Sequence, residues 1–110
     1  MSSNDLVRLS AAVLETCSVV PAESLLTAAP QERGALVHHG GTVTCGVWEA
    51  TPYAERLDDY PVNEFAHVLS GKLAITPDDG LAQTFGPGEA YCMPKAFSGR
   101  FEVIETMRKS

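Results

Sequence analysis

"ITPDDGLAQTFGPGEAYCMP", residues 75–94, carries two turn signals about ten residues apart, with short apolar runs on either side. In "TPDDG", Pro77 presets φ and Gly80 can take a positive φ, a combination that favours a short hairpin loop. "GPG" marks the second turn, and the run "EAYCM" ends at Pro94. Such closely spaced turns predict a repeated β scaffold.

The same pattern extends from Gly34 through the rest of the sequence. Short runs rich in β-forming residues are separated by Gly, Pro and Asp, and they read "GTVTCGVWEA", "EFAHVLSG", "KLAIT", "LAQTF" and "GRFEVIETM". No stretch after residue 34 has a helical period. About six or seven short strands at this spacing predict an antiparallel β sandwich or barrel.

The first 34 residues have a different character and predict an irregular arm. The expected organisation is therefore an N-terminal arm over 1–34 and a barrel domain over 35–110. "SAAVLE" can begin a short helix with Ser10 as its cap, but Pro21 and Pro30 interrupt the segment that follows. We expect the arm to pack on the barrel or on a partner subunit.

Composition excludes several classes of function. With 110 residues the chain is expected to form one domain. A net charge of −6 argues against nucleic acid as a partner, because phosphate backbones are bound by clustered Lys and Arg. No apolar run reaches the ~18 residues of a membrane span, and the N-terminus lacks the continuous apolar region of a secretory signal. Three widely spaced cysteines predict reduced thiols, and we expect a cytoplasmic protein.

Two spacings carry a family resemblance. Six residues separate Glu64 from Gly71 in "EFAHVLSG", and five separate Gly88 from Pro94 in "GPGEAYCMP". These spacings resemble the two signature motifs of the cupin superfamily of small jelly-roll barrels. "GVWEATP", "TPDDG", "FGPGEA" and "MPKAFSGRFEV" further resemble the small cupins grouped with ureidoglycine aminohydrolase and with EutQ of ethanolamine utilisation.

The resemblance covers about residues 35–109. It implies an all-β fold, an antiparallel double-sheet jelly-roll barrel that carries the irregular N-terminal arm. It also implies pairing into a homodimer through sheet edges and terminal arms.

A metal site is a further expectation from the family, and this sequence does not complete it. A metal-binding cupin has histidines at the positions of Asp58, Tyr60 and Gly99, so only Glu64 remains of the usual ligands. A mononuclear metal ion needs three or four protein donors, and we therefore predict neither metal ligands nor a cofactor. The alternative is a metal-dependent, aminohydrolase-like enzyme in which Glu64 acts with other oxygen donors, such as Asp58 and Glu49.

Glu64 is the leading candidate for a functional residue because its motif position is interior to the barrel. An interior carboxylate must be paired, hydrogen-bonded or protonated, and a raised pKa would suit it to general acid or base catalysis. We predict Glu64 and Lys95 as catalytic residues, and as ligand-binding residues Trp48, Glu49, Tyr53, Tyr60, Tyr91 and Phe97. Core packing is the alternative role for the aromatic residues.

The charged residues divide between two segments. Residues 49–64 are mainly acidic, whereas residues 94–109 carry Lys95, Lys109 and two arginines. The two motifs lie on neighbouring strands in the cupin fold, so opposite charges are expected to meet near the barrel mouth, either as surface ion pairs or around a pocket. We expect a pocket that binds or acts on a small polar metabolite, with catalysis left open. A non-catalytic interaction module of a metabolic complex is the alternative.

Overall fold

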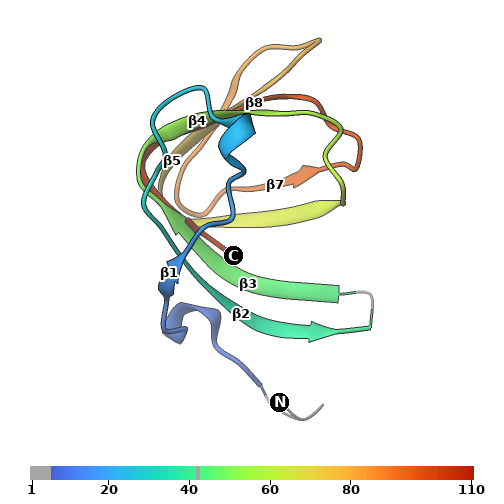
Figure 1. Cartoon of the computed structure of the whole chain (residues 1–110). Coiled ribbons are helices and arrows are strands. Elements are labelled where there is room, and N and C mark those ends of the chain that lie inside the picture. Colours follow the sequence, from blue (N-terminus) through green and yellow to red (C-terminus); the bar gives the residue numbers. More distant parts are fainter. Residues whose placement is uncertain (1–5, 42) are drawn as a thin grey trace.

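The computed structural model describes residues 6–41 and 43–110, and these residues form strands and no α-helix. No helix among them is long and apolar enough to cross a membrane. Figure 1 shows strands that wrap around a common interior. Two short 3-10 turns are η1 (Leu9–Ala11) and η2 (Ala22–Ser24). The strands are β1 (Glu15–Cys17), β2 (Glu32–Gly40), β3 (Val43–Ala50), β4 (Tyr53–Leu57), β5 (Glu64–Pro77), β6 (Gln83–Phe85), β7 (Ala90–Met93) and β8 (Gly99–Lys109).

The described strands pair in antiparallel fashion, in the hydrogen-bonded order β1-β2-β3-β8-β5-β6. β4 pairs with β8 and β7 pairs with β5, so the long strands β5 and β8 are shared between two layers. β1 and β6, at the two ends of the order, are not hydrogen-bonded to each other in the described residues. The predicted all-β, antiparallel double-sheet fold is confirmed, but the described strands form an open double sheet and not a closed barrel.

The register of β8 decides which side chains enter the interior. On one side of β8, Trp48 of β3 pairs with Lys109, and Glu55 of β4 pairs with Phe101. On the other side, Val68 of β5 also pairs with Lys109. Side chains alternate across a strand, so the even spacing between Phe101 and Lys109 places both on the inner face. Burial follows this alternation, and the buried core comprises Ala50, Tyr53, Ala66, Val68, Leu73, Ile75, Tyr91, Met93, Phe101, Val103 and Met107.

The two turns predicted in residues 75–94 form where they were expected. Ile75 of β5 pairs with Gln83 of β6, and the Gly80 N–H donates to the Pro77 carbonyl oxygen at 3.2 Å. The positive φ predicted at Gly80 is wrong, because the loop over 78–82 is long enough to reverse the chain without it. Gly88 in "GPG" does take a positive φ, of 86°.

The N-terminal arm extends the sheet and covers part of it. β1 adds to the edge of β2, and the helix predicted to begin at Ser10 is reduced to the 3-10 turn η1. Further along, Leu25 forms a bridge with Glu55, and the Leu26 N–H donates to the Ala54 carbonyl oxygen at 2.9 Å. The arm therefore packs on the body of the same chain, over β4.

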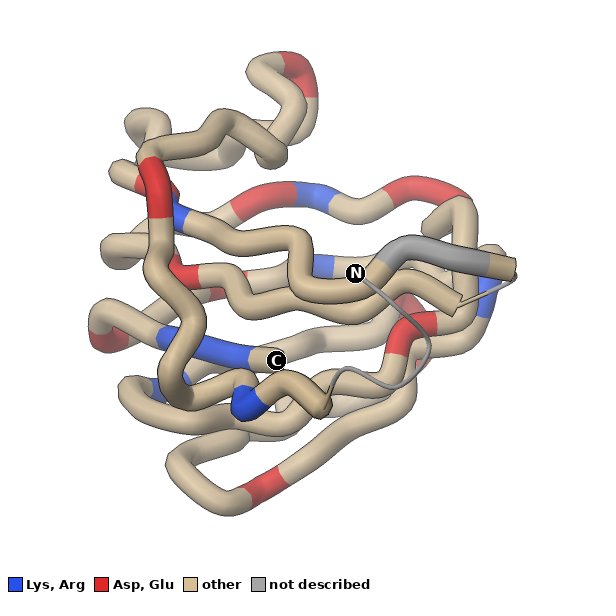
Figure 2. Tube along the Cα trace, turned by 90° about the horizontal axis from the view of Figure 1, so that it is seen from below, with Lys and Arg blue, Asp and Glu red and all other residues tan. Residues whose placement is uncertain are grey.

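Lys and Arg positions are spread over several strands, many beside acidic positions (Figure 2). On the outer face of the sheet, Glu49 accepts from Arg33 at 2.7 Å and from Arg108 at 2.9 Å. Together with the pair between Glu64 and Lys109, this confirms that acidic groups of residues 49–64 meet basic groups of residues 94–109.

Candidate functional site

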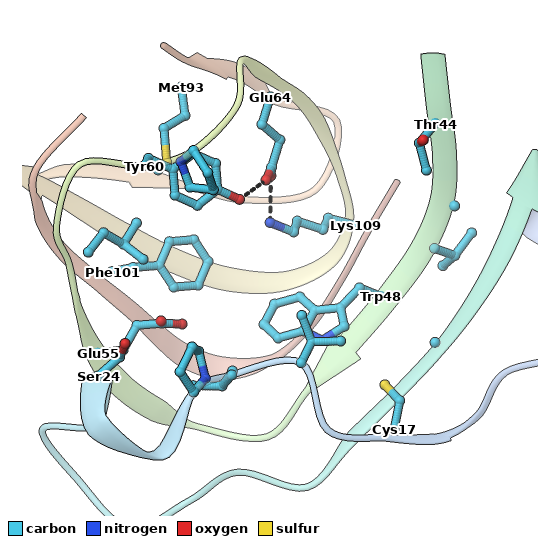
Figure 3. Close-up of a pocket in the computed structure, with 18 of the residues that line it drawn as sticks. Cys17, Ser24, Thr44, Trp48, Glu55, Tyr60, Glu64, Met93, Phe101 and Lys109 are labelled. Atoms are coloured by element: carbon cyan, nitrogen blue, oxygen red, sulfur yellow. Dashed lines mark hydrogen bonds and ion pairs between the residues drawn. The ribbon is translucent and has the colours of Figure 1, made fainter. Parts of the chain in front are cut away.

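A cavity of about 820 Å3 lies inside the double sheet and is open to solvent. Its walls come from β2, β3, β4 and β8, from the start of β5 and the segment before it, and from residues of the arm between positions 17 and 24 (Figure 3). The volume falls within the range of small-molecule sites, which is about 300–1,000 Å3. Most of the wall is apolar. Its charged lining residues are Glu55, Glu64 and Lys109, together with Arg56 and Asp58, which are exposed and paired with each other.

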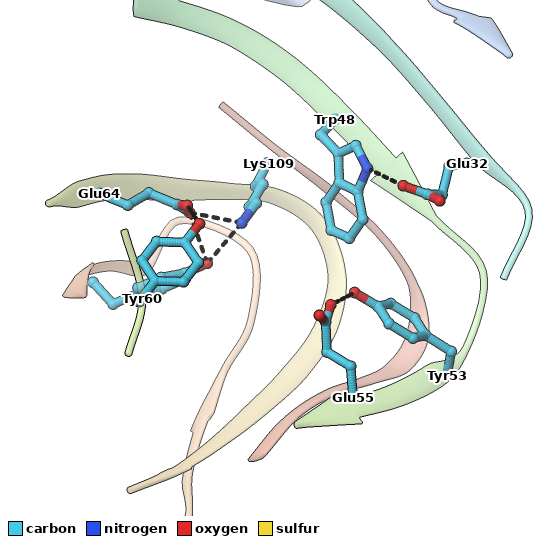
Figure 4. Close-up of polar contacts among 8 residues, drawn as sticks. Glu32, Trp48, Tyr53, Glu55, Tyr60, Glu64 and Lys109 are labelled. Carbon is cyan, nitrogen blue, oxygen red and sulfur yellow. Dashed lines mark hydrogen bonds and ion pairs between the residues drawn. The ribbon is translucent and has the colours of Figure 1, made fainter. Parts of the chain in front are cut away.

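Glu64 is held by three side chains from different elements. The Lys109 ammonium donates to Glu64 Oε2 at 2.7 Å and to the Tyr91 hydroxyl at 3.1 Å (Figure 4). The Tyr60 hydroxyl donates to Glu64 Oε1, and the Tyr91 hydroxyl makes a longer contact of 3.5 Å with Oε2. We call Glu64, Lys109, Tyr60 and Tyr91 the polar centre.

Strand pairing brings the polar centre together. Glu64 begins β5, and Ala66, two residues further on the same face, pairs with Tyr91 of β7. Val68, again two residues on, pairs with Lys109 near the end of β8. The polar side chains therefore converge from three adjacent strands, while Tyr60 reaches them from the segment before β5. Glu64, Lys109 and Tyr60 line the cavity, whereas Tyr91 lies beside a smaller hollow.

Three aromatic rings lie near the Lys109 ammonium, in addition to the polar groups. Nζ lies 5.1 Å from the ring centroid of Trp48, 5.2 Å from that of Phe101 and 5.7 Å from that of Tyr91. Such distances are within the range of cation–π attraction, which strengthens when the cation is desolvated. The Lys109 side chain is only 16% exposed. The interior thus stabilises a positive charge at this position.

The ionisation of the polar centre differs from the sequence-based expectation. Burial by itself would raise the pKa of Glu64, but the charge of Lys109 and the hydrogen bonds from Lys109, Tyr60 and Tyr91 outweigh it and lower that pKa below 4.5. This direction is opposite to the raised pKa considered for catalysis, and it fits the alternative that an interior carboxylate is paired and hydrogen-bonded. Burial would likewise lower the pKa of Lys109, but Tyr91 and Glu64 reverse the direction and raise it.

A second carboxyl, Glu55, lies in another part of the cavity. It is 6% exposed, and it accepts a hydrogen bond from the hydroxyl of Tyr53, which is 3% exposed (Figure 4). Burial raises the pKa of Glu55. The hydrogen bond from Tyr53 and the charge of Lys109 act in the opposite direction, but burial has the larger effect. The pKa of Tyr53 is also raised, by burial and by its bond to Glu55.

Glu32 ties the arm to the cavity wall. Its Oε1 accepts from the indole N–H of Trp48 at 2.9 Å and from the Val19 N–H at 3.1 Å. The Val20 N–H lies 3.4 Å from both carboxylate oxygens. Because Trp48, Val19 and Val20 all line the cavity, this buried carboxylate fixes the position of one wall.

The structure brings some of the predicted site residues together and separates others. Trp48, Tyr53 and Tyr60 line the cavity with Glu64, and Tyr91 contacts Glu64 through its hydroxyl. Tyr91 itself borders a smaller hollow of about 370 Å3, as Phe97 does. Of the remaining predicted residues, Glu49 is paired on the outer face and Lys95 is exposed.

Sequence reasoning missed Lys109 and Glu55 as site residues, although a signal for each was present. Lys109 follows Phe101 and Val103 at even spacing, and Glu55 follows Tyr53 at the same spacing, so alternation alone places both on inner faces. The lysine predicted to act with Glu64 was Lys95, which directly follows the second motif and is exposed. Only the register of β8 against β5 shows that Lys109 is the lysine that reaches Glu64.

The residues around Glu64 do not fit the metal site of the fold family. Among the described residues, no three His, Cys, Asp or Glu side chains converge to form a metal site. Asp58 is exposed and paired with Arg56, Gly99 offers no donor side chain, and the Tyr60 hydroxyl donates to Glu64. Beside Glu64 Oε2, the Lys109 ammonium already supplies a positive charge.

Comparisons with known proteins give consistent relatives. Residues 37–110 match the family of EutQ-like cupin domains. A protein of unknown function from Pseudomonas syringae pv. tomato has a similar structure, with a TM-score of 0.81, 19% identity and 90% of this chain covered, and the chain spans only 43% of that protein. A DUF861 family protein from Thermotoga maritima is 30% identical, with a TM-score of 0.53 over 57% of this chain and 70% of that one.

The EutQ protein of Clostridium difficile is also similar in structure, with a TM-score of 0.65 and 19% identity over 84% of this chain and 70% of that one. Among curated proteins, no match to the chain is found. At 19% identity, the similarity to the Pseudomonas and Clostridium proteins supports the fold alone.

Proposed function

The chain belongs to the family of EutQ-like cupin domains, as its two motifs predict, and we propose that it binds a small polar molecule in the cavity, at the polar centre. The observation that carries this proposal is the ion pair between Glu64 and Lys109 inside a solvent-open cavity of about 820 Å3. A largely apolar pocket with a few convergent polar groups is the usual form of a small-molecule site.

Stability alone is a weak reason for such a pair. Removing two charges from water costs several kcal/mol per ion, and apolar side chains of similar size often serve a protein core equally well or better. Glu64 and Lys109 are 23% and 16% exposed, so neither is fully solvated. A charged pair kept at this cost, with open space in front of it, is better explained by a role in binding.

The polar centre also has unused hydrogen-bonding capacity. An ammonium has three N–H donors, and among the described residues only Glu64 and Tyr91 accept from Lys109. The remaining N–H is available to an oxygen of a ligand. The Trp48 and Phe101 rings beside the ammonium provide flat apolar surfaces for the rest of the molecule.

The proposal is tested by a thermal-shift screen of a metabolite library against three proteins: the native chain, Glu64→Gln and Glu49→Gln. A ligand that binds the folded state stabilises it by mass action. We expect at least one compound to raise the unfolding temperature of the native chain and of Glu49→Gln, but not that of Glu64→Gln. Glu49→Gln is the matched control, because it removes an ion-paired carboxylate on the outer face of the sheet. Equal stabilisation of all three proteins by every active compound would contradict the proposal.

A further inference from the structure

Glu55 has an environment that the polar centre does not explain. Its carboxyl group points into the cavity, in the region between Phe101 and Trp48 (Figure 3). The residue is 94% buried, given its exposure of 6%. It lies on β4 opposite Phe101 of β8, so the alternation of two paired strands fixes its direction.

The hydrogen bonds of Glu55 leave half of its carboxyl group unused. The Tyr53 hydroxyl donates to Oε2, and among the described residues no other group bonds to the carboxyl group. No side-chain oxygen in the described part of the chain is both fully buried and without a partner. Glu55 Oε1 therefore remains accessible, and the space that it faces is the cavity.

Charge around Glu55 is not balanced within the described chain. The described ion pairs give it no Lys, Arg or His partner, whereas Glu64 has Lys109 and Glu49 has two arginines. The titratable groups that face Glu55 are Tyr53 on β4, Glu32 on β2, Lys109 on β8 and Tyr60 before β5. Lys109 is already neutralised by Glu64. Glu32 has no ion-pair partner among the described residues either, and it accepts only from neutral N–H groups. An ionised Glu55 therefore adds a negative charge to a region that no described cation balances.

We propose that Glu55 is the counter-ion for a cationic group of the ligand, so that the cavity takes a small organic ammonium or amidinium compound. This inference rests on the proposed function and specifies its ligand class. The rings of Trp48, Tyr53 and Phe101 lie 6.3–6.4 Å from one another beside Glu55, and aromatic faces attract organic cations. A bare metal ion is less suited, because one carboxylate among apolar side chains cannot replace its hydration shell.

Binding of a cation is then coupled to the loss of a proton. Burial raises the pKa of Glu55, so below that pKa the empty cavity holds the neutral acid. A cation binds to the ionised form, which releases the proton to solvent. The apparent affinity therefore rises with pH until Glu55 is ionised in the free protein, and it is constant above that point.

The test is a calorimetric or NMR titration with propylammonium, using propionate and 1-propanol as probes of equal chain length and different charge. We expect saturable binding of propylammonium to the native chain, and we expect it to be tighter at about pH 8 than at about pH 5. The probe itself is protonated at both pH values, so the difference reports on the protein. Glu55→Gln keeps the shape of the neutral acid, and we expect it to bind propylammonium at least about tenfold more weakly, without the pH dependence. Glu49→Gln is expected to bind as the native chain does.

Tyr53→Phe is a second variant that keeps the carboxyl group and removes only its hydrogen-bond donor. We expect it to retain propylammonium binding. The inference is overturned if the native chain does not bind propylammonium, if Glu55→Gln binds it equally well, if propionate binds more tightly, or if Tyr53→Phe loses as much affinity as Glu55→Gln. A screen in which only uncharged or anionic compounds depend on Glu64 overturns this inference and leaves the proposed function in place.

Discussion

The Lys109 ammonium contacts a carboxylate, a phenol and three aromatic rings, and this set of neighbours determines the chemistry of the interior. Surface ion pairs contribute about 0–1 kcal/mol, which is the range for Arg33 with Glu49, whose side chains are 50% and 19% exposed. Breaking a buried pair is different, because the remaining charge loses its partner without regaining water.

Replacing Lys109 tests this difference. In Lys109→Met, Glu64 keeps its position but loses its cation, and we expect the free energy of unfolding at neutral pH to fall by about 3–5 kcal/mol. Removing the second charge as well, in Lys109→Met with Glu64→Gln, should restore part of the loss, with a coupling of at least about 1 kcal/mol. Urea unfolding of the two single variants and the double variant measures this. Strictly additive losses would show that the two side chains do not interact.

The pH dependence of stability provides a separate check on Glu64. Its pKa is lower in the folded chain than its ordinary value of 4.5, so the unfolded chain binds more protons between these two values. The ionised carboxylate therefore stabilises the fold above about pH 4.5, and this contribution is lost as the pH falls through the lower pKa.

We expect the native chain to be more stable than Glu64→Gln at pH 7 and the difference to shrink toward pH 3, in denaturant unfolding curves recorded at each pH. Glu55 is present in both proteins, so its own ionisation largely cancels in the comparison. A difference that stays constant or grows on acidification would contradict the ionised state of Glu64.

At the scale of the strands, alternation and turn signals predicted an antiparallel sandwich or barrel, and the double sheet followed from the family resemblance. The runs "EFAHVLSG" and "KLAIT" join in the single strand β5, and the run that begins at Gly99 forms β8. The pairing between the two strands could not be predicted, because the register shifts between Val68 and Leu73 follow from contacts distant in sequence. For the same reason the candidate site was predicted only in part: Glu64 is central, but its cationic partner depends on that register.

Gly71, in the first motif, allows these shifts. It has a φ of 81°, and a Cβ there would overlap the carbonyl oxygen of Thr106 and the backbone of Met107 on β8. Gly88, in the second motif, has a similar φ of 86° but open space around it. Alanine substitutions at the two positions therefore separate two costs. Both substitutions place a Cβ at a positive φ, but only the one at Gly71 also disturbs the close approach of β5 and β8.

We expect Gly88→Ala to destabilise the fold by about 1–2 kcal/mol, the usual cost of a left-handed conformation for a residue with a Cβ. Gly71→Ala should cost roughly 1–3 kcal/mol more, because β8 must also move away. The comparison of their unfolding free energies in urea measures the close approach directly. Equal losses would mean that β5 and β8 are less tightly packed at this bulge than the structure shows.

For the whole molecule, the notable feature is how much space is left inside so short a chain. Protein interiors are normally packed as densely as organic crystals, yet a cavity of about 820 Å3 is kept between the layers, with the arm as one wall. Two carboxyl groups and one ammonium are directed into it from β4, β5 and β8. An open cavity that keeps polar groups in place of close packing supports the ligand binding that we propose.

The most direct measurement is a calorimetric titration of the most strongly stabilising compound from the library into the native chain, Glu64→Gln and Glu49→Gln. We expect the Glu49→Gln protein to bind with the native affinity. In contrast, we expect Glu64→Gln to bind at least about tenfold more weakly, because it changes the charge of the polar centre that the ligand is proposed to contact, and a hydrogen bond to a charged group contributes about 1.5–3 kcal/mol. Equal dissociation constants for Glu64→Gln and the native chain would contradict binding at the polar centre.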